Sequence, residues 1–400
     1  MIRKLKPSEL EDSIRLSEFA FQYEMTEEER RERLSSLNPD VTWIVENNGE
    51  IMSKASVLPF HVYIDGKPFK MGGVAGVATW PEHRRSGLVA QLLKHALKDM
   101  KANGQTLSFL HPFSIPFYRK FGWELFSDEA QVTLSKEQLP GRIPHKGYVK
   151  RIEPDYLAIN DAYQQWAKRY SGTLVRDEKW WKDSLFKRKK GTLAAYYHEN
   201  QCTGYMIYTV KEMKMTIHEL IWITPDARNG LMSFISNHDS MIETVSITTT
   251  PHERLPFLLP DPKVKHEVTS YFMARIVDVH YFLNEYPFKF ASDISPLIFH
   301  VTDETCEWNN GTYIIKLREA KENDIEFFPF SDEKTKEGVS CQHAPKKGLH
   351  LDVRMLIAIL LGSQSPQTLV EEAWIESDEK TLAALTKSLP PLKPFLYDFF

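Results

Sequence analysis

The segment His83-Arg84-Arg85-Ser86-Gly87-Leu88-Val89 joins a predicted strand to a predicted amphipathic helix. The first turn of a helix has free N–H groups and a partial positive charge, which suits a pyrophosphate. Gly87 has no side chain to hold a phosphate away from those amides, and Arg84 and Arg85 add positive charge. The segment therefore predicts a phosphate cradle. The alternative is an ordinary helix start with two solvated arginines, because short motifs of this kind are common.

The end of the chain is the second feature that could carry chemistry. It reads Lys393-Pro394-Phe395-Leu396-Tyr397-Asp398-Phe399-Phe400, whereas chain ends are usually frayed and polar. Apolar side chains gain free energy when they are buried. The tail is therefore predicted to dock, which places the carboxylate of Phe400 inside the protein. A docked tail with no chemical role is the alternative.

The elements that position the cradle can be predicted from turns and periodicity. Asn47-Asn48-Gly49-Glu50 and Asp65-Gly66 are hairpin-turn signals, and the apolar residues between 87 and 100 have helical spacing. The predicted strands span residues 42–46, 51–58, 60–64, 70–79, 106–110 and 123–134, and the predicted helices include 27–37, 87–100 and 116–121. This order predicts an α/β fold with a mixed sheet and helices on both faces.

The segment Trp222–Met232 echoes the segment Ala78–Leu88. Both read as a strand end, a proline, an acid, an arginine, a glycine and an apolar helix, which indicates a duplicated fold. In the second copy Gly230 comes one residue late and Asn229 replaces an arginine, so we expect phosphate binding to be lost there.

Three domains are predicted along the chain. Residues 139–144 resemble a linker, helices are expected at 153–168 and 179–188, and an α+β pattern begins near Asp278. The predicted boundaries are 1–138, 139–282 and 283–400.

Composition excludes several classes of protein. The 400 residues are 42% hydrophobic and 26% charged, with a net charge of -4, so nothing indicates general attraction to nucleic acid or membrane. The N-terminus lacks an apolar signal core. Cys202, Cys306 and Cys341 have no metal-ligand spacing. We expect a cytoplasmic, metal-free protein.

The motif Arg-x-x-Gly-x-Val, after a strand that ends Ala-Thr-Trp-Pro, resembles the coenzyme A loop of the GNAT acetyltransferase superfamily. Val89 stands where that superfamily usually has Gly or Ala. The longer string His-Arg-Arg-x-Gly-Leu is similar to the Eis (enhanced intracellular survival) family, and Arg275–Val279 matches that family's junction into its last domain. The resemblance implies two tandem GNAT folds, the second degenerate, followed by a sterol-carrier-protein-like α+β domain.

By this resemblance the chain uses acetyl-CoA and acetylates an amine. The implied coenzyme-binding residues are Val77, Ala78, Thr79, Arg84, Arg85, Ser86, Gly87, Leu88, Val89, Ala90, Phe113 and Ser114. The strand residues make physical sense, because pantetheine carries amides and can extend a sheet edge as a peptide does.

The resemblance also implies an acid and a base. Tyr118, in the frame Phe-Tyr-x-x-Phe-Gly, is the expected general acid, and the carboxylate of Phe400 is the expected general base. Arg119 and Lys120 either lower the pKa of Tyr118 or are simply solvated. Without the motif, Tyr118 would be a packing tyrosine on a short helix.

The acceptors implied by the resemblance are small amine-rich molecules, including aminoglycosides acetylated at more than one position. Four acids are candidates to attract such cations and four aromatic residues to wall the pocket, although both sets also fit a solvated face and a core: Glu24, Glu27, Glu28 and Glu29, and Phe19, Phe21, Tyr23 and Trp43. Two alternatives stay open, a peptide or protein N-acetyltransferase and a non-enzymatic acyl or lipid carrier. Relatives in the family form rings, so a homo-oligomer, a hexamer, is expected.

Overall fold

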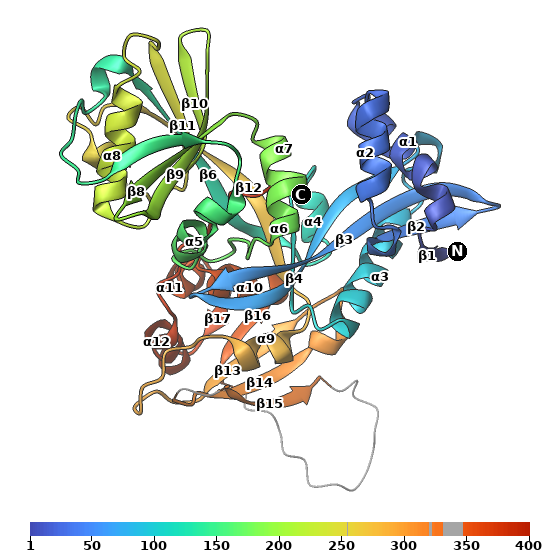
Figure 1. Cartoon of the computed structure of the whole chain (residues 1–400). Helices are drawn as coiled ribbons and strands as arrows, with labels where there is room; N and C mark the ends of the chain where they lie inside the picture. The colour runs from blue at the N-terminus through green and yellow to red at the C-terminus, as the bar shows by residue number, and fades with distance from the viewer. Residues whose placement is uncertain (254, 320–321, 331–346) are drawn as a thin grey trace, which may run out of the picture.

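The structure is a computed structural model of the chain, and it describes residues 1–253, 255–319, 322–330 and 347–400 (Figure 1). The strands among these residues are β1 (Ile2–Lys4), β2 (Thr42–Asn47), β3 (Glu50–Ile64), β4 (Lys67–Thr79), β5 (Leu107–Leu110), β6 (Glu124–Ser135), β7 (Tyr148–Ile152), β8 (Thr192–His198), β9 (Gln201–Lys211), β10 (Lys214–Trp222), β11 (Thr244–Thr249), β12 (Lys265–Ile276), β13 (Leu297–Thr302), β14 (Gly311–Lys316), β15 (Asp324–Pro329), β16 (Leu349–Asp352) and β17 (Glu376–Ser377). The helices are α1 (Leu10–Phe21), α2 (Glu27–Ser36), α3 (Leu88–Ala102), α4 (Ile115–Arg119), α5 (Tyr156–Ala167), α6 (Glu178–Trp180), α7 (Phe186–Arg188), α8 (Pro225–Ser236), α9 (Val279–Glu285), α10 (Val353–Leu361), α11 (Pro366–Glu371) and α12 (Glu379–Ser388).

A single sheet joins the two copies of the duplicated fold, β1 to β6 and β7 to β12. Within the described residues it has 12 strands in the order β1-β2-β3-β4-β5-β12-β6-β11-β10-β9-β8-β7. In each copy a helix connects two parallel strands, β4-α3-β5 in the first and β10-α8-β11 in the second. The duplication predicted from the echo is therefore confirmed. Strand β12 of the second copy lies between β5 and β6 of the first, antiparallel to both, so the sheet is continuous.

The hairpin of β3 and β4 follows its sequence signals. The strands meet at Asp65 and Gly66, whose φ angles of 47° and 75° are those that a two-residue hairpin turn requires. The two strands predicted on either side of Pro59 form one strand, β3, in which Pro59 pairs across to Gly72. Helix α3 then buries the apolar face predicted from its spacing, namely Leu92, Leu93, Ala96, Leu97 and Met100.

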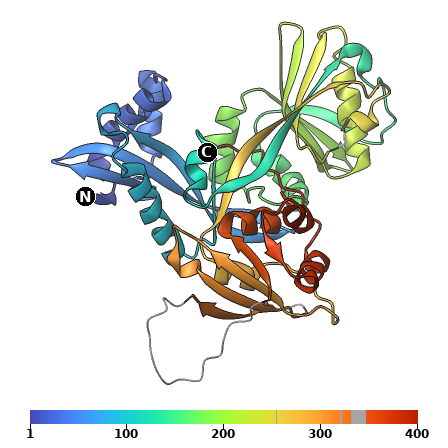
Figure 2. The same cartoon turned by 180° about the vertical axis from the view of Figure 1, so that it is seen from behind.

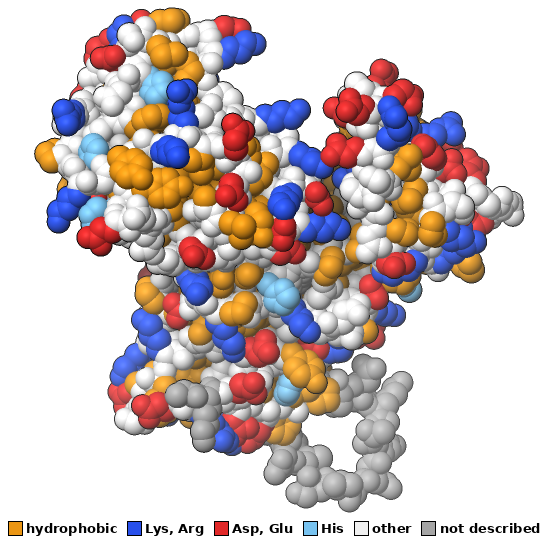
Figure 3. Space-filling model, viewed as in Figure 1, with side chains coloured by type: hydrophobic (Ala, Val, Ile, Leu, Met, Phe, Trp, Pro, Cys, Tyr) orange, Lys and Arg blue, Asp and Glu red, His pale blue; other side chains and the backbone are white. Residues whose placement is uncertain are grey.

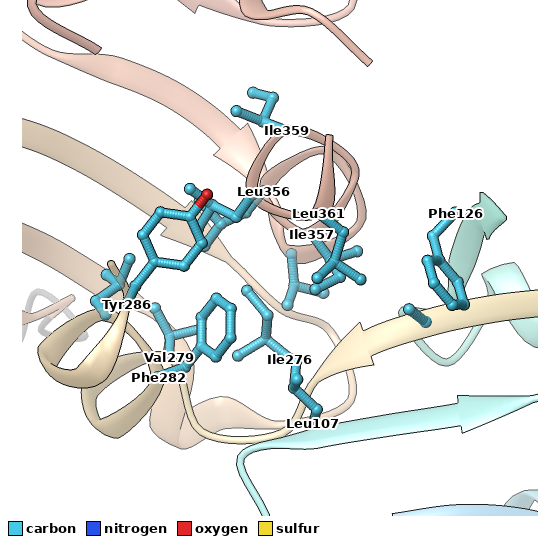
Figure 4. Close-up of a cluster of buried hydrophobic side chains, with 14 of the residues drawn as sticks. Leu107, Phe126, Ile276, Val279, Phe282, Tyr286, Leu356, Ile357, Ile359 and Leu361 are labelled. Carbon is cyan, nitrogen blue, oxygen red and sulfur yellow. The ribbon is translucent and has the colours of Figure 1, made fainter. Parts of the chain in front are cut away.

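The C-terminal part folds as an α+β unit against the large sheet. Its own sheet has 5 strands in the part of the chain that the structure describes, in the order β15-β14-β13-β16-β17. Helix α10, capped by Asp352, contacts β6, β12 and β16. Figure 4 shows Leu107 and Ile276 of the large sheet in one buried cluster with Phe282 of α9 and Leu356 of α10. This shared core fixes the C-terminal part beneath the first copy.

The C-terminus lies apart from the rest of the C-terminal part. Both views put it close to α4, α6 and α7, away from the sheet of that part (Figures 1 and 2).

The cysteines form no disulfide among the described residues. Cys202 and Cys306 are free thiols, and Cys341 lies outside the described residues. None of the described helices combines the length and the apolar character that crossing a membrane requires.

Candidate active site

The edge of β4 opens beside β5. The two parallel strands pair only as far as Val74 and Leu110. Strand β4 then continues to Thr79, while the chain beyond β5 turns away through residues 111–114 into α4. In the described part of the chain, no strand pairs with this side of β4 after Val74. The edge is therefore available to an extended molecule that carries amides.

A bulge in β4 marks the point where the strands separate. Gly76, with φ 58°, and Val77 lie opposite the single residue Ala55 of β3. Val77 lines the cavity described below, whereas Ala78 and Thr79 are buried at 4% and 8% exposure. Of the three predicted strand residues, only Val77 thus has a side chain on the cavity.

The predicted phosphate loop is exposed and leads into α3. Arg84 Nε donates to the carbonyl oxygen at the end of β4 at 3.3 Å, and Ser86 closes a turn inside the loop. Arg85 has a φ of 64°, a strained conformation for this residue type that clusters at functional sites. The amides of Leu88–Ala90 have no acceptor within the helix. A Cβ atom added at Gly87 would meet nothing within 4 Å, so the space before the helix is open.

The corresponding helix of the second copy has a different N-terminus. Thr224 caps α8, and the carboxylate of Asp226 accepts a hydrogen bond from Lys146 N at 3.0 Å. Gly230 lies inside the helix, where a Cβ atom would come within 2.1 Å of the Tyr196 ring. The glycine therefore permits close packing, and an acidic side chain stands where a phosphate would bind. Both observations favour the predicted loss of phosphate binding in this copy.

Tyr118 lies on α4, at 2% exposure, with its ring 5.3 Å from that of Phe113 and 6.2 Å from that of Trp123. Burial raises the pKa of Tyr118. Of the two alternatives for Arg119 and Lys120, a lowered pKa of Tyr118 is therefore not the one found, and Arg119 Nη2 instead binds the Glu124 carboxylate at 2.6 Å.

The C-terminal tail is docked, as its apolar residues predict. Phe395 and Leu396 are completely buried, and Tyr397 and Phe400 are 4% and 7% exposed. The ring of Phe400 lies 5.0 Å from that of Phe60 on β3. The tail therefore brings the C-terminal end of the chain onto the sheet of the first copy.

A buried ion-pair network holds the tail. Asp398 accepts from Arg176 Nε at 2.9 Å and from Trp180 Nε1 at 2.7 Å. Arg176 also binds both carboxylate oxygens of Glu219, at 2.8 and 2.9 Å. Burial raises the pKa of Glu219, but Arg176 and then Lys189 outweigh that effect and hold the pKa below its ordinary value. The network is thus internally neutralised.

A cavity of about 1220 Å³ lies where these parts meet. Val77, Phe113, Tyr118 and Phe400 line it, so the structure brings four predicted residues together. The other predicted coenzyme residues do not line it; Arg84 lines a second hollow, of about 1040 Å³, beside the connection between α1 and α2. Among the described residues, no group of three or more His, Cys, Asp or Glu side chains could hold a metal ion.

The four acids proposed to attract a cationic acceptor are not on this cavity. Glu24 lines the second hollow, and Glu29 caps the start of α2 through Thr26. Glu27 and Glu28 belong to the exposed first turn of α2. The structure therefore favours the interpretation of a solvated helix start. Of the four aromatic residues, Phe21 and Tyr23 line the cavity, Phe19 lies against Trp80, and Trp43 lies against His95.

Sequence reasoning missed most titratable side chains of the cavity, and four of them matter for its chemistry. His111 follows β5 directly, with its ring 5.0 Å from that of Phe399, and desolvation lowers its pKa, so it is a neutral proton acceptor at pH 7. The others are Arg33, Lys54 and Arg188. His111 could have been found from the sequence, because it directly follows an apolar strand. The three cations come from distant segments, and no sequence pattern indicates that they share a cavity.

Comparison with known proteins assigns each part of the chain. Family models match an acetyltransferase (GNAT) domain at residues 1–126, a second acetyltransferase (GNAT) domain at 172–276, and a sterol carrier protein domain at 279–397. The N-acetyltransferase Eis of Mycobacterium tuberculosis is 25% identical over 235 residues, which cover 54% of this chain and 57% of that protein. An uncharacterized N-acetyltransferase of Streptomyces griseus is 23% identical over 255 residues, 54% of this chain and 59% of its own length. The chain thus matches somewhat more than half of these relatives' lengths.

Solved structures share the whole architecture. A probable N-acyltransferase from Enterococcus faecalis has a TM-score of 0.89 and 27% identity, covering 100% of this chain and 99% of that one. Eis1 from Mycobacterium abscessus has a TM-score of 0.81 at 18% identity, with 100% of both chains covered, and shows the same fold. The chain therefore consists of two tandem GNAT domains and a sterol-carrier-protein-like domain, as its motifs predict. Its sequence is similar to that of the Eis N-acetyltransferases, and its fold is that of Eis1.

Proposed function

We propose that this chain is an acetyl-CoA-dependent N-acetyltransferase that acts on the amine of a small molecule. The observation that carries this proposal is the unpaired edge of β4. One end of that edge leads to the open N-terminus of α3, and its bulge lines the cavity that holds Tyr118. A molecule with a phosphate at one end, amides along its length and a reactive group at the other end fits these three features in order: the N-terminus of α3, the edge of β4 and the cavity.

The coenzyme would lie along residues of the first copy. Residues 84–90 would hold the pyrophosphate, because this loop combines two arginines with free helix amides. Val77, Ala78 and Thr79 would pair with the pantetheine arm, and Phe113 and Ser114 would flank it. In this proposal the second copy supplies Arg176 and α7 as pocket wall and binds no coenzyme.

Acetyl-CoA supplies an acetyl group that is activated as a thioester. In the proposed reaction the bond from the amine nitrogen to the acetyl carbon forms and the bond from that carbon to sulfur breaks. The carboxylate of Phe400 accepts the proton that the amine loses, and the Tyr118 hydroxyl gives its proton to the leaving sulfur. The raised pKa of Tyr118 keeps the hydroxyl protonated at neutral pH, so the donor is always loaded. His111 is the residue that could replace Phe400 as base.

Several finer parts of the proposal rest on family resemblance. They are the amine-rich acceptor such as an aminoglycoside, the domain boundaries after residues 138 and 282, the cytoplasmic location and the homohexamer. Light scattering at micromolar concentration tests the last of these, because a monomer has a mass of 46.5 kDa.

The direct test is an acetyl-transfer assay. The chain is incubated with acetyl-CoA and a panel of small amines, an aminoglycoside and a short peptide, and both free coenzyme A thiol and acetylated product are measured. We expect turnover with small amines. Turnover with the peptide alone would favour the protein N-acetyltransferase alternative, and turnover with nothing would favour the carrier alternative.

A further inference from the structure

Three cations line the cavity without an acidic partner. Arg33 of α2, Lys54 of β3 and Arg188 of α7 come from both copies and face the same space. Within the described residues, none of the three has a carboxylate oxygen within the 4.0 Å of an ion pair. Figure 3 shows Lys and Arg side chains at the hollow between the two upper lobes, with Asp and Glu side chains among them.

Lys54 is the buried member of the group, at 5% exposure. Its ammonium donates to Ser13 O, to Ser13 Oγ at 2.8 Å and to Ser17 Oγ at 2.6 Å, all of them neutral groups. Burial and then the charge of Arg33 lower the pKa of Lys54 to about 7. A buried cation without a counter-ion is unfavourable, so an anion at this place would stabilise it.

Arg188 lies on the same cavity. One of its nitrogens donates to the carbonyl oxygen of Phe399 at 2.6 Å, and the guanidinium stands 5.1 Å from the Phe399 ring. Desolvation and then the charge of Arg33 lower the pKa of Arg188. Arg33 is therefore close enough to repel both Lys54 and Arg188, and the three form one field of like charge.

The other charged groups of the cavity do not cancel this field. Lys187 is neutralised by Glu32 and by Asp183 at 4.0 Å, and Asp177 is engaged in capping α6. Arg176 is neutralised inside the buried network. The cations Arg33, Lys54 and Arg188, with Lys179 as a further lining cation, outnumber the terminal carboxylate of Phe400 and Asp177.

We infer that the acceptor is an amine that also carries an anionic group, a carboxylate or a phosphate, bound between Arg33 and Arg188. This inference rests on the proposed acetyl transfer, and it replaces the amine-rich acceptor that the family resemblance implies by an amine with an anionic group. An anion held by Arg33 and Arg188 would leave the amine facing the part of the cavity that Tyr118 and Phe400 line. A polycation such as an aminoglycoside or polyamine would meet like charge there.

The test compares acceptors that differ by one anionic group. The pairs are O-phosphoethanolamine against ethanolamine and phenylalanine against 2-phenylethylamine, with spermidine as the cationic acceptor. For the parent chain we expect kcat/KM to favour one or both anionic members by about tenfold or more, the effect of one charge pair near a protein surface. Which pair shows the larger preference distinguishes phosphate from carboxylate.

Matched variants assign the effect to the cationic wall. Arg33→Gln should reduce the preference about tenfold by raising KM for the anionic member only. Arg188→Gln should reduce the preference as well, but it also removes the hydrogen bond to the carbonyl oxygen of Phe399, so only the ratio of the two acceptors is compared. Arg33→Glu should favour spermidine instead. Arg33 is exposed on a helix, so its variants should fold. Lys211→Gln, which changes a lysine 84% exposed on β9, is the control and should leave every ratio unchanged. Differences in amine basicity cancel when variant and parent ratios are compared.

Calorimetry with O-phosphoethanolamine separates this inference from the proposed function. Binding to the parent that is lost in Arg33→Gln supports the anion site, even if no amine in the panel is acetylated and the proposed function fails. Equal turnover of neutral, cationic and anionic amines, with ratios unaffected by Arg33→Gln and Arg33→Glu, overturns the inference while acetyl transfer stands.

Discussion

Tyr118 is buried beside Phe113 on the cavity, and its hydroxyl is the proposed proton donor. Replacing Tyr118 by Phe removes only that proton and keeps the ring in place. We expect kcat to fall by a factor of about a hundred to ten thousand, with the affinity for acetyl-CoA nearly unchanged. Tyr148→Phe, at an exposed tyrosine on β7, is the control. Steady-state kinetics with unaltered kcat in Tyr118→Phe would reduce the residue to a packing role.

The terminal carboxylate of Phe400 is the proposed base. Removing Phe400 moves the carboxylate back by one residue, about 3.5 Å, which is beyond hydrogen-bond reach of the amine. A C-terminal extension converts the carboxylate to an amide and should do similar harm. Both changes should lower kcat but spare coenzyme affinity, as measured by calorimetry. Parent-like rates in folded variants would mean that the tail is merely packed and would point to His111 as base.

Lys54 should make the chain more stable as the pH rises above about 7. Its pKa is about 7 in the folded chain, against an ordinary value of 10.5. Between these values the unfolded chain binds one proton more than the folded chain, so this group makes the free energy of unfolding rise with pH. Below pH 7 both states are protonated and its unfavourable contribution is constant.

Lys54→Met should remove this dependence. The free energy of unfolding of the variant minus that of the parent should fall by about 1.4 kcal/mol per pH unit between roughly pH 7.5 and 10. Urea denaturation of both proteins at pH 6, 7, 8 and 9 measures the difference. A difference that is constant over this range would contradict the buried, unpaired placement of Lys54.

At the scale of elements, the tail depends on the ion pairs of Asp398. Asp398→Asn leaves Arg176 with one acidic partner, and breaking a buried pair costs up to about 3–5 kcal/mol. We expect lower stability and faster hydrogen exchange of the backbone amides from 395 to 400. Asp293→Asn breaks an exposed pair with Lys387 and should change neither quantity. Unchanged protection of the tail in Asp398→Asn would show that apolar burial alone docks it.

Sequence patterns predicted the elements whose signals are local. The hairpin turn at Asp65-Gly66, the apolar face of α3 and the echo at Trp222–Met232 depend on neighbouring residues, and the structure confirms them. The predicted helix 179–188 is confirmed as helical from α6 to α7, but its middle, Trp181–Leu185, is a π-helix that the sequence did not predict. Its adjacent indole groups, Trp180 and Trp181, donate to Asp398 and Asn160 respectively, and such tertiary contacts have no periodicity to read.

Features made by distant segments could not be predicted from the residues alone. Strand β12 inserts between β5 and β6, and no pattern in residues 265–276 indicates which strands they pair with. The family motif identified Tyr118 and Val77, but Arg33, Lys54 and Arg188 meet only through the fold. The acceptor class expected from resemblance and the class inferred from the cavity consequently carry opposite charge.

At the scale of the whole molecule, one continuous sheet and one docked tail connect all three parts. The cavity takes its walls from both copies and from the tail, although the first copy alone carries the open helix N-terminus. The second copy is therefore proposed as structure for the site rather than a second catalyst. The first copy is thus proposed to bind the coenzyme and to hold the general acid, whereas the second copy and the tail complete the acceptor pocket.

Calorimetric titration with acetyl-CoA tests this claim most directly. We predict one binding site per chain. Gly87→Glu should abolish binding, because it adds bulk and negative charge where the pyrophosphate would meet the amides of α3. Asn229→Glu adds the same charge to α8 of the second copy and should bind acetyl-CoA as the parent does. Two sites per chain, or an affinity unchanged in Gly87→Glu, would contradict the account.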